Sequence, residues 1–505
     1  MPTRRTLLKG AAALAAAGTG IVGIGQGASA AVNNRWNSLR RNLSGKLVLP
    51  SDSNYDVAKQ LHFSAFDAVQ PAAIAYCTSP KDVQVCLAYA QHHGLPAVPR
   101  SGGHSFGGYS TTNGLVIDVS RLNGIQVEQN KTVVGPGAQL VDLVDTASAH
   151  GVALAGGICP TVAMGGYLQG GGVGWQTRAL GLGCDSLLSA QVVLADGCVV
   201  TCSEQVRPDL FWALRGGGGG NFGIVTSYER RNSTIPRMVN FTLAWLWDSA
   251  ESVLTAWQQW QRAAPRALSS RWLLGLLDAA PGAVPFLLVD GTFLGTPEDL
   301  TPHLNALASA VGTPPAYNSV QDLGFRDGMM AFFKCGDKTV DQCHRVGTNP
   351  EAMLARSGFI IQRSRFFRED IPGTGVSEIL AAFDADRRAG QTRIATGFAL
   401  GGAASDIPRT ATAYVHRDAQ FSVDWAVALS EAADTGEGRA AASAWADNAF
   451  TVTDRYSTHE TYQNYVDPAL TDWREAYYAE NYPRLSTVKH TYDPHGFFSF
   501  AQAIS

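Results

Sequence analysis

The sequence predicts an α+β protein made of two domains, and three observations support this. The chain has 505 residues, which is more than one average domain contains. Residues 67–231 alternate short strand-like and helical runs around glycine-rich loops. After Pro236 glycine becomes sparse, and helical stretches rich in Trp, Leu and Ala alternate with strand-like runs. The net charge of -4 leaves no basic surplus that would indicate a nucleic-acid partner.

The first part follows the order strand, helix, strand, glycine loop, strand, and then alternates again. Apolar periodicity and turn residues predict strands at Ala72–Ala75, Leu95–Pro99, Leu115–Val119, Val133–Ala138 and Val152–Leu154, and helices at Lys81–His93 and Leu140–His150. Asp196-Gly197 predicts a hairpin turn between strands at Gln191–Leu194 and Val199–Thr201.

The second part has longer helices. They are predicted at Ser252–Ala264, Leu300–Val311 and Val376–Ala389, with strands at Trp272–Leu277, Phe286–Val289 and Thr412–Val415. The last fifty residues return to aromatic sequence punctuated by Pro and Gly, and we expect them to close the first domain. The predicted limits are residues 31–235 for the first domain, 236–454 for the second, and 455–505 for the closing segment.

Residues 1–30 have the features of an export signal rather than of the folded protein. Arg4 and Arg5 form a twin-arginine head, an apolar stretch rich in Ala and Gly follows, and Ala28-Ser29-Ala30 is a small-residue cleavage site. The apolar run is too short and too rich in Gly and Ala for a membrane anchor, which needs about 20 apolar residues. We therefore expect an extracytoplasmic protein without stable membrane insertion. The twin-arginine route carries folded proteins, which favours a bound cofactor.

The eight cysteines indicate one disulfide and no metal site. Cys335 and Cys343 lie in a polar, loop-like stretch and are the best disulfide candidates of an exported chain. Cys198 and Cys202 do not predict a zinc site, because no second Cys/His pair follows at ligand spacing. Most other cysteines are expected to be buried as small apolar residues.

Three glycine clusters carry the chemical signal. The first is the loop Arg100-Ser101-Gly102-Gly103-His104-Ser105, in which consecutive glycines after a strand allow backbone N–H groups to approach a pyrophosphate. The second comprises residues 156–162, Gly165-Gly166 and residues 170–174, and so much glycine suggests that a flat ring lies against the backbone. The third is residues 215–225. Its match to GxGxxG does not predict a dinucleotide fold, since the loop leads into a strand-like run and not into a helix.

Together these clusters resemble the FAD-linked oxidases of the berberine-bridge-enzyme type, within the vanillyl-alcohol oxidase superfamily. The tail adds Tyr462-Gln463-Asn464-Tyr465, residues 481–485 and Tyr492-Asp493-Pro494. Each motif is weak alone, but their order and spacing are specific, and they span nearly all of the chain after the signal. The resemblance implies the two-domain PCMH-type FAD-binding fold, whose substrate domain combines an antiparallel sheet with helices.

The resemblance also implies a covalently bound FAD. His104 matches the histidine bonded to the flavin 8α-methyl group, and Cys159 matches the cysteine bonded to flavin C6 in the bicovalent members. The further residues expected to bind the cofactor are Arg100, Ser101, Gly102, Gly103, Ser105, Gly165, Gly166, Gly170, Gly171, Gly172, Gly223, Ile224, Val225 and Asn464. Two covalent bonds should raise the flavin potential and keep FAD bound outside the cell.

The catalytic base is expected in the tail. On a strand, Tyr462 and Asn464 would share one face and Tyr465 would occupy the other. In similar proteins a tyrosine of this motif takes the hydroxyl proton while hydride passes to flavin N5. We favour Tyr465, with Tyr462 second, although a phenol with a pKa of about 10 needs a lowered pKa or a proton chain to act near neutral pH.

Two positions depart from the family pattern. Val173 stands where bicovalent relatives often have a tyrosine, and Phe106 replaces a tyrosine found in some relatives. The second proton-handling group is therefore open, with Tyr167, Tyr109 and His416 as candidates. The loss of two hydroxyls also suggests a less polar substrate pocket.

The predicted activity is oxidation of an alcohol or sugar hydroxyl of a small molecule, with O2 converted to H2O2. A secondary metabolite is favoured over a free oligosaccharide. Two alternatives stay open: flavin-dependent oxidative cyclisation, which shares base and flavin, and a flavin-carrying binding protein without turnover. The sequence leaves open whether the protein is a monomer or a homodimer.

Overall fold

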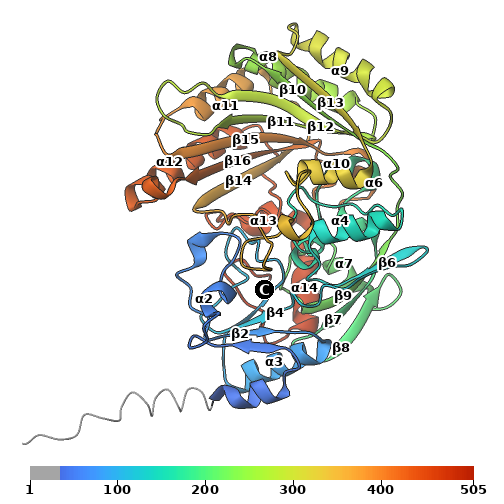
Figure 1. Ribbon diagram of the computed structural model, residues 1–505, viewed down its shortest axis with the longest axis vertical. Helices are drawn as coiled ribbons and strands as arrows, with labels where there is room; N and C mark the ends of the chain where they lie inside the picture. The colour runs from blue at the N-terminus through green and yellow to red at the C-terminus, as the bar shows by residue number, and fades with distance from the viewer. Residues whose placement is uncertain (1–34) are drawn as a thin grey trace, which may run out of the picture.

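The computed structural model describes residues 35–505, and in this part of the chain three sheets are present. The lower half in Figure 1 holds two small sheets with their helices, and the upper half holds one large sheet covered by helices on its outer face. The predicted export signal lies outside the described residues. Within residues 35–505, no helix is both long enough and apolar enough to cross a membrane.

The first small sheet has four strands in the order β1-β2-β4-β3. They are β1 (Lys46–Val48), β2 (Ala73–Tyr76), β3 (Ala97–Arg100) and β4 (Leu115–Asp118), with β4 parallel to both β2 and β3. The helix α3 (Pro80–His92) connects β2 to β3, and the Ser79 side chain caps it by accepting from the Asp82 N–H. The predicted strands and helix of this region are thus confirmed to within two residues at each end. Because β3 ends at Arg100, the glycine loop after it begins at the sheet edge.

The second small sheet is antiparallel, with five strands in the order β5-β6-β9-β7-β8. They are β5 (Ile125–Val127), β6 (Lys131–Val134), β7 (Leu187–Val193), β8 (Val199–Ser203) and β9 (Ile224–Arg231), accompanied by α4 (Leu140–Ala149), α5 (Met164–Gln169), α6 (Thr177–Leu180) and α7 (Pro208–Ala213). Gly197 adopts a φ of 83° in the predicted hairpin turn between β7 and β8. The third glycine cluster leads directly into β9, which confirms that it does not precede a helix.

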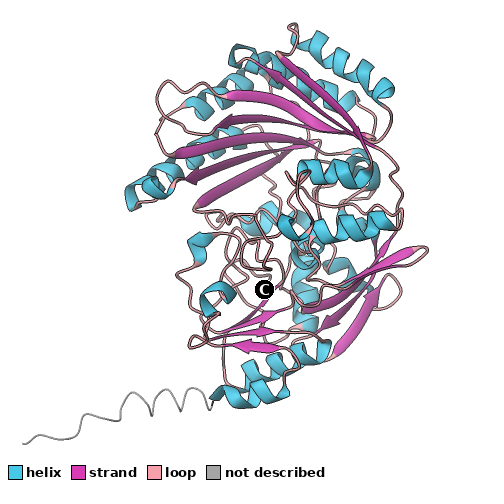
Figure 2. Ribbon diagram, in the orientation of Figure 1, coloured by secondary structure: helices cyan, strands magenta, loops and turns pink. Residues whose placement is uncertain are grey.

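The large sheet has seven antiparallel strands in the order β13-β10-β12-β11-β15-β16-β14. They are β10 (Met238–Trp245), β11 (Leu268–Leu276), β12 (Phe286–Phe293), β13 (Tyr317–Leu323), β14 (Ile360–Phe367), β15 (Gln391–Ala399) and β16 (Phe421–Leu429). The outer face is covered by α8 (Ala250–Ala263), α9 (Pro297–Val311), α11 (Gly373–Asp384) and α12 (Gly436–Asp454), as Figure 2 shows. Trp257, Trp425 and Trp445 fill the core between them. The inner face is left to meet the lower half.

Two predicted elements of this half differ from the structure. Thr412–Val415 is not a strand, because its backbone bonds to the C-terminal end of α7 and the residues after it: Ala413 N–H donates to Trp212 O at 3.2 Å and Tyr414 N–H to Arg215 O at 3.0 Å. The predicted helix Val376–Ala389 ends earlier, at Asp384, and Asp386 then adopts a positive φ of 50° that a helix does not tolerate.

The end of the chain returns to the lower half. It forms α13 (Trp473–Tyr478) and α14 (Tyr482–Tyr492), which pack beside the third glycine cluster. Lys489 Nζ donates to Asn221 O at 2.8 Å, Tyr478 OH donates to Gly217 O at 3.1 Å, and the Ile504 N–H donates to Asn221 Oδ1 at 3.0 Å. These bonds from the end of the chain therefore hold the third glycine cluster in place.

The disulfide predicted between Cys335 and Cys343 is present, with a Cα–Cα distance of 6.0 Å. It follows α10 (Phe325–Phe332), which packs against α4, so it lies where the upper half meets the lower. Cys77, Cys86, Cys184 and Cys202 are buried thiols, as expected.

Candidate active site

A cavity of about 490 Å³ lies between the glycine loops of the lower half and the tail. Most of the residues expected to bind the cofactor or to act in catalysis line it: Ser101, Gly102, Gly103, His104, Ser105, Cys159, Gly165, Gly166, Gly223, Ile224, Val225, Tyr462, Asn464 and Tyr465. The structure thus brings together four segments that are far apart in the sequence. Phe106 and Val173, the two positions that lack a hydroxyl, also line this cavity.

Four predicted cofactor-binding residues do not line the cavity. Arg100 is buried outside the cavity lining. Its Nε pairs with Asp118, and its Nη2 donates to Ala58 O at 2.8 Å. Gly170, Gly171 and Gly172 are needed for a different reason. A Cβ on each would collide with the side chain of Asn464, Tyr414 or Tyr167, respectively. These glycines make room for aromatic and amide side chains rather than for a ligand.

His104 is held at one end of the cavity by contacts on two sides. Its Nε2 lies 2.8 Å from Thr161 Oγ1, and the His62 ring stacks on its face with centroids 4.1 Å apart. The loop reaches this position because Gly103 adopts a φ of 69°, which favours glycine. Burial, together with nearby His62 and Arg345, holds the pKa of the His104 imidazole well below its usual value. His104 is therefore neutral near pH 7.

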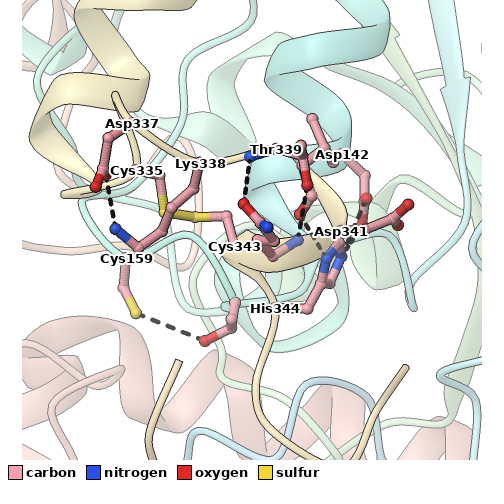
Figure 3. Close-up of a disulfide and its surroundings, with 12 residues drawn as sticks. Asp142, Cys159, Cys335, Asp337, Lys338, Thr339, Asp341, Cys343 and His344 are labelled. Carbon is pink, nitrogen blue, oxygen red and sulfur yellow. Dashed lines mark hydrogen bonds and ion pairs between the residues drawn. A yellow bond between two sulfur atoms is a disulfide. The ribbon is translucent and has the colours of Figure 1, made fainter. Parts of the chain in front are cut away.

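Cys159 meets the same threonine from the opposite side. Its Sγ lies 3.9 Å from Thr161 Oγ1, a contact drawn in Figure 3 beside the Cys335–Cys343 disulfide. Burial raises the pKa of the thiol, although hydrogen bonds from Thr161 and Val162 oppose this. One hydroxyl thus holds both side chains at the cavity wall. We refer to His62, His104, Cys159 and Thr161 as the attachment end.

The glycines of the cavity fit a flat group such as FAD. A Cβ on Gly166 would have no protein atom within 4 Å, and one on Gly219 would meet only the Gly166 Cα, at 3.7 Å. Both residues line the cavity, so side chains there would project into it. Bare backbone at these two neighbouring positions allows close approach of a ring system, as the glycine clusters suggest.

The motif Tyr462–Tyr465 forms a turn and not the predicted strand. The Tyr465 N–H donates to Tyr462 O at 2.8 Å, which reverses the chain and places both rings 5.0 Å apart at the cavity. The prediction that the two tyrosines occupy opposite faces is therefore wrong. The turn forms because Asn464 Nδ2 donates both to Tyr167 O, at 3.1 Å, and to Tyr462 OH, at 3.0 Å.

The two tyrosines differ in their surroundings. Tyr462 OH accepts hydrogen bonds from the Gly172 and Val173 N–H groups, both at 3.0 Å, and from Asn464. Burial still raises its pKa to about 12. The pKa of Tyr465 is raised well above its usual value by burial and by nearby Asp424. Neither phenol alone is a base near neutral pH.

A recess of about 170 Å³ opens beside the tyrosines, and the inner face of the large sheet forms its floor. Strands present alternate side chains to one face, so β11, β14, β15 and β16 supply the floor residues. The recess is lined by Ile158, Val173, Gly174, Arg271, Gln362, Phe366, Ile394, Thr396, Phe398, Leu400, Ser422, Asp424, Ala426, Tyr462 and Tyr465. Five of these also line the main cavity, which makes the two spaces continuous.

Asp424 is the notable group of the recess, and sequence reasoning missed it. Its Oδ2 accepts from Ser422 Oγ at 2.9 Å, whereas Oδ1 is shielded from solvent and has no hydrogen-bond partner among residues 35–505. Burial raises the pKa of this carboxyl to about 7, which the Ser422 bond opposes. The other charged side chain, Arg271, is satisfied by two hydrogen bonds to Asp290, at 2.7 and 2.9 Å.

None of the three candidate proton-handling partners lines the recess, although Tyr167 and Tyr109 line the main cavity. Tyr167 OH donates to Gly172 O at 3.0 Å, and the Tyr109 ring packs on Phe500 at 4.9 Å. His416 Nδ1 lies 2.8 Å from Glu460 Oε2, outside the cavity lining. For Asp424, the only sequence signal is the period-two alternation of residues 421–429, which places it on the face opposite the apolar side chains. The alternation does not show that the lower half of the protein covers the face that carries Asp424.

Comparison with known proteins agrees with this geometry. Residues 71–203 match the family model of an FAD binding domain, and residues 461–505 match the model described as berberine and berberine like. The chain is 31% identical over 469 residues to the uncharacterized FAD-linked oxidoreductase YgaK of Bacillus subtilis, an alignment that covers 92% of this chain and 97% of that protein.

The chain belongs to the berberine-bridge-enzyme-like FAD-linked oxidoreductases. It is an FAD-dependent enzyme with the PCMH-type two-domain α+β fold. The xylooligosaccharide oxidase of Thermothelomyces thermophilus is 28% identical, with coverage of 86% of this chain and 87% of that protein. Among solved structures, glucooligosaccharide oxidase from Acremonium strictum, described with a 6-S-cysteinyl, 8α-N1-histidyl FAD, superposes with a TM-score of 0.82. Its sequence is 24% identical, and the match covers 93% of this chain and 99% of that one.

Proposed function

We propose that this protein is an exported oxidase that holds FAD through two covalent bonds, at His104 and Cys159, and oxidises an alcohol or sugar hydroxyl of a small molecule. The observation that carries the proposal is the attachment end. An imidazole and a thiol from separate loops both line a glycine-rich cavity and meet at the Thr161 hydroxyl. FAD bound there would supply a two-electron acceptor and a route from O2 to H2O2.

The attachment end suits bond formation to carbon. Neutral His104 keeps a nitrogen lone pair, and its Nε2 meets the Thr161 hydroxyl at 2.8 Å. The glucooligosaccharide oxidase relative is described with a histidyl linkage through N1 and a cysteinyl linkage. The same pair of residue types lines the wall here.

The recess suits removal of the hydroxyl proton. Asp424 Oδ1 lacks a hydrogen-bond partner from the residues that the structure describes, so a substrate hydroxyl that enters the recess can donate to it. A carboxyl with a pKa of about 7 is a better proton acceptor near neutral pH than a buried phenol. We assign Tyr465 and Tyr462 to contact and orient the substrate hydroxyl, and Asp424 to accept its proton. Asp424 would then serve as the second proton-handling group, which is missing because Val173 and Phe106 lack the tyrosine hydroxyls of relatives.

Export is supported by the twin-arginine head and the cleavage site of residues 1–30. Permanent attachment fits this destination, because a lost cofactor could not be replaced outside the cell. Among substrates, a secondary-metabolite alcohol or sugar appendage is favoured over a free oligosaccharide. The pocket has lost the two family hydroxyls at Val173 and Phe106.

The test is an anaerobic screen of alcohols and sugars for bleaching of the flavin absorbance, followed by admission of air. Rapid bleaching, fast return of the yellow colour and formation of H2O2 are expected. A bleached protein that does not reoxidise in air would contradict the oxidase assignment. A product with a new C–C or C–O bond would instead show oxidative cyclisation, because simple oxidation leaves the carbon skeleton unchanged.

A further inference from the structure

His62 lies in the attachment end, although no motif of the sequence draws attention to it. Its ring stacks on His104 with centroids 4.1 Å apart and an interplanar angle of 21°. Both residues line the cavity. The ring therefore covers one face of the imidazole, while the Thr161 hydroxyl holds the Nε2 edge.

The position of His62 is fixed independently of His104. Its N–H donates to Gly103 O at 3.0 Å, and its carbonyl accepts from the Ser357 N–H at 3.1 Å. Ser357 Oγ also lies 3.2 Å from His62 Nε2, and the Phe63 ring meets the imidazole edge-on at 4.8 Å. Because backbone and ring are both held, His62 is a rigid platform and not a mobile surface side chain.

The charges around the stack keep both rings neutral. Burial, with the cationic Arg345 and Arg356 nearby, lowers the pKa of His62 to about 4. Arg356 is itself paired with both carboxylate oxygens of Asp67, at 2.6 and 2.8 Å. His62 Nδ1 is shielded from solvent and has no hydrogen-bond partner in the described part of the chain, which would be costly for a charged ring. Because the His62 ring is neutral, it adds no positive charge beside His104 that would disfavour reaction at the flavin 8α-methyl carbon.

We propose that His62 is a positioning residue for covalent attachment, which holds the His104 imidazole in the plane that presents Nδ1 to the flavin. This rests on the proposed function. The bond joins Nδ1 to the 8α-methyl carbon, one methyl hydrogen and the ring hydrogen leave as two protons, and the two electrons pass to O2 to give H2O2. His62 does not take part in these exchanges. It reduces the ring orientations that His104 samples before the bond forms.

The test isolates the histidyl bond by working in the Cys159→Ala background. Protein produced in riboflavin-starved cells receives FAD, and the flavin that stays with the acid-precipitated protein is followed over time. Adding His62→Ala should slow attachment about three- to tenfold, the loss expected for one aromatic contact. Adding His62→Phe, which keeps a flat ring without titratable nitrogens, should restore most of the rate.

The matched control uses the His104→Ala background, in which only Cys159 bonds the flavin. There His62→Ala should leave the attachment rate unchanged, with the same FAD uptake measured by absorbance. Equal slowing in both backgrounds would overturn the proposal, because His62 would then support FAD binding in general. Unchanged attachment in the Cys159→Ala background would overturn it as well. If Cys159→Ala alone releases all flavin into the supernatant, the His104 bond itself is absent, and the proposed function fails at that point.

Discussion

The attachment end and the recess are two ends of one continuous space, but they are built differently. The attachment end comes from loops, and its His104 and Cys159 meet at one threonine as neutral groups. The recess comes from four strands of the large sheet, and it contains a carboxyl with a pKa of about 7 beside a closed Arg271–Asp290 pair. The difference suggests that the protein separates holding the cofactor from moving the substrate proton. Changes at one end should then leave the other end's function intact.

The largest effect is expected from Asp424→Asn. The amide keeps the shape and can still bond Ser422, but it cannot accept a proton. Flavin reduction by substrate under anaerobic conditions should slow by about 10²- to 10⁴-fold. The amount of covalently bound flavin should match the parent protein, and Ser422→Ala is the control with an intact carboxyl. Loss of covalent flavin in Asp424→Asn would contradict the claim that the recess and the attachment end work independently.

A smaller effect is expected from Tyr465→Phe. Removing the hydroxyl deletes one hydrogen bond to the reacting oxygen, which should slow flavin reduction roughly 10- to 100-fold. Tyr462→Phe is the matched comparison, because its hydroxyl also accepts from the Gly172 and Val173 N–H groups and so shapes the loop. If Tyr465→Phe reduces its flavin at the parent rate while Tyr462→Phe does not, Tyr465 does not contact the reacting hydroxyl and its assignment is wrong.

The pH dependence of reduction tests the recess alone. Asp424 must be ionised to accept a proton, and burial raises its pKa to about 7. The rate of anaerobic reduction should therefore be at its plateau above pH 7 and fall about tenfold per unit well below it. The Asp424→Asn variant should lack this step. A profile that is flat from pH 5 to 8 in the parent protein would exclude Asp424 as the proton acceptor.

The smallest effect is expected in the wall of the main cavity, at Gly166→Ala. The added methyl group would project into the cavity, where no protein atom lies within 4 Å of it. It should lower the FAD content of the purified protein a few-fold by filling space the ring needs. Gly373→Ala, at an equally open position in α11, is the control and should keep the parent content. Equal FAD content in both variants would mean that the ring does not lie against Gly166.

The same contrast explains what the sequence could predict. His104 and Cys159 were predictable because they and the glycine clusters lie in contiguous motifs whose order and spacing resemble those of a known family. In the upper half, 3.6-residue periodicity predicted α8, α9 and, with a late end, α11, but α10 and α12 were not predicted. Asp424 and Arg271 were not, because they are single polar residues on strands, and only the packing of the two halves shows that this face is covered. The turn at Tyr462–Tyr465 depends on the distant Tyr167 carbonyl. His62 becomes visible only through its stacking on His104.

The most direct test of the central claim is the intact mass of the denatured mature protein and its variants. The parent chain should carry the mass of one FAD, and His104→Ala and Cys159→Ala should each still carry it through the remaining bond. Only the double variant should be free of it, while it still binds FAD before denaturation. A parent chain whose mass equals that of the polypeptide alone would contradict covalent attachment.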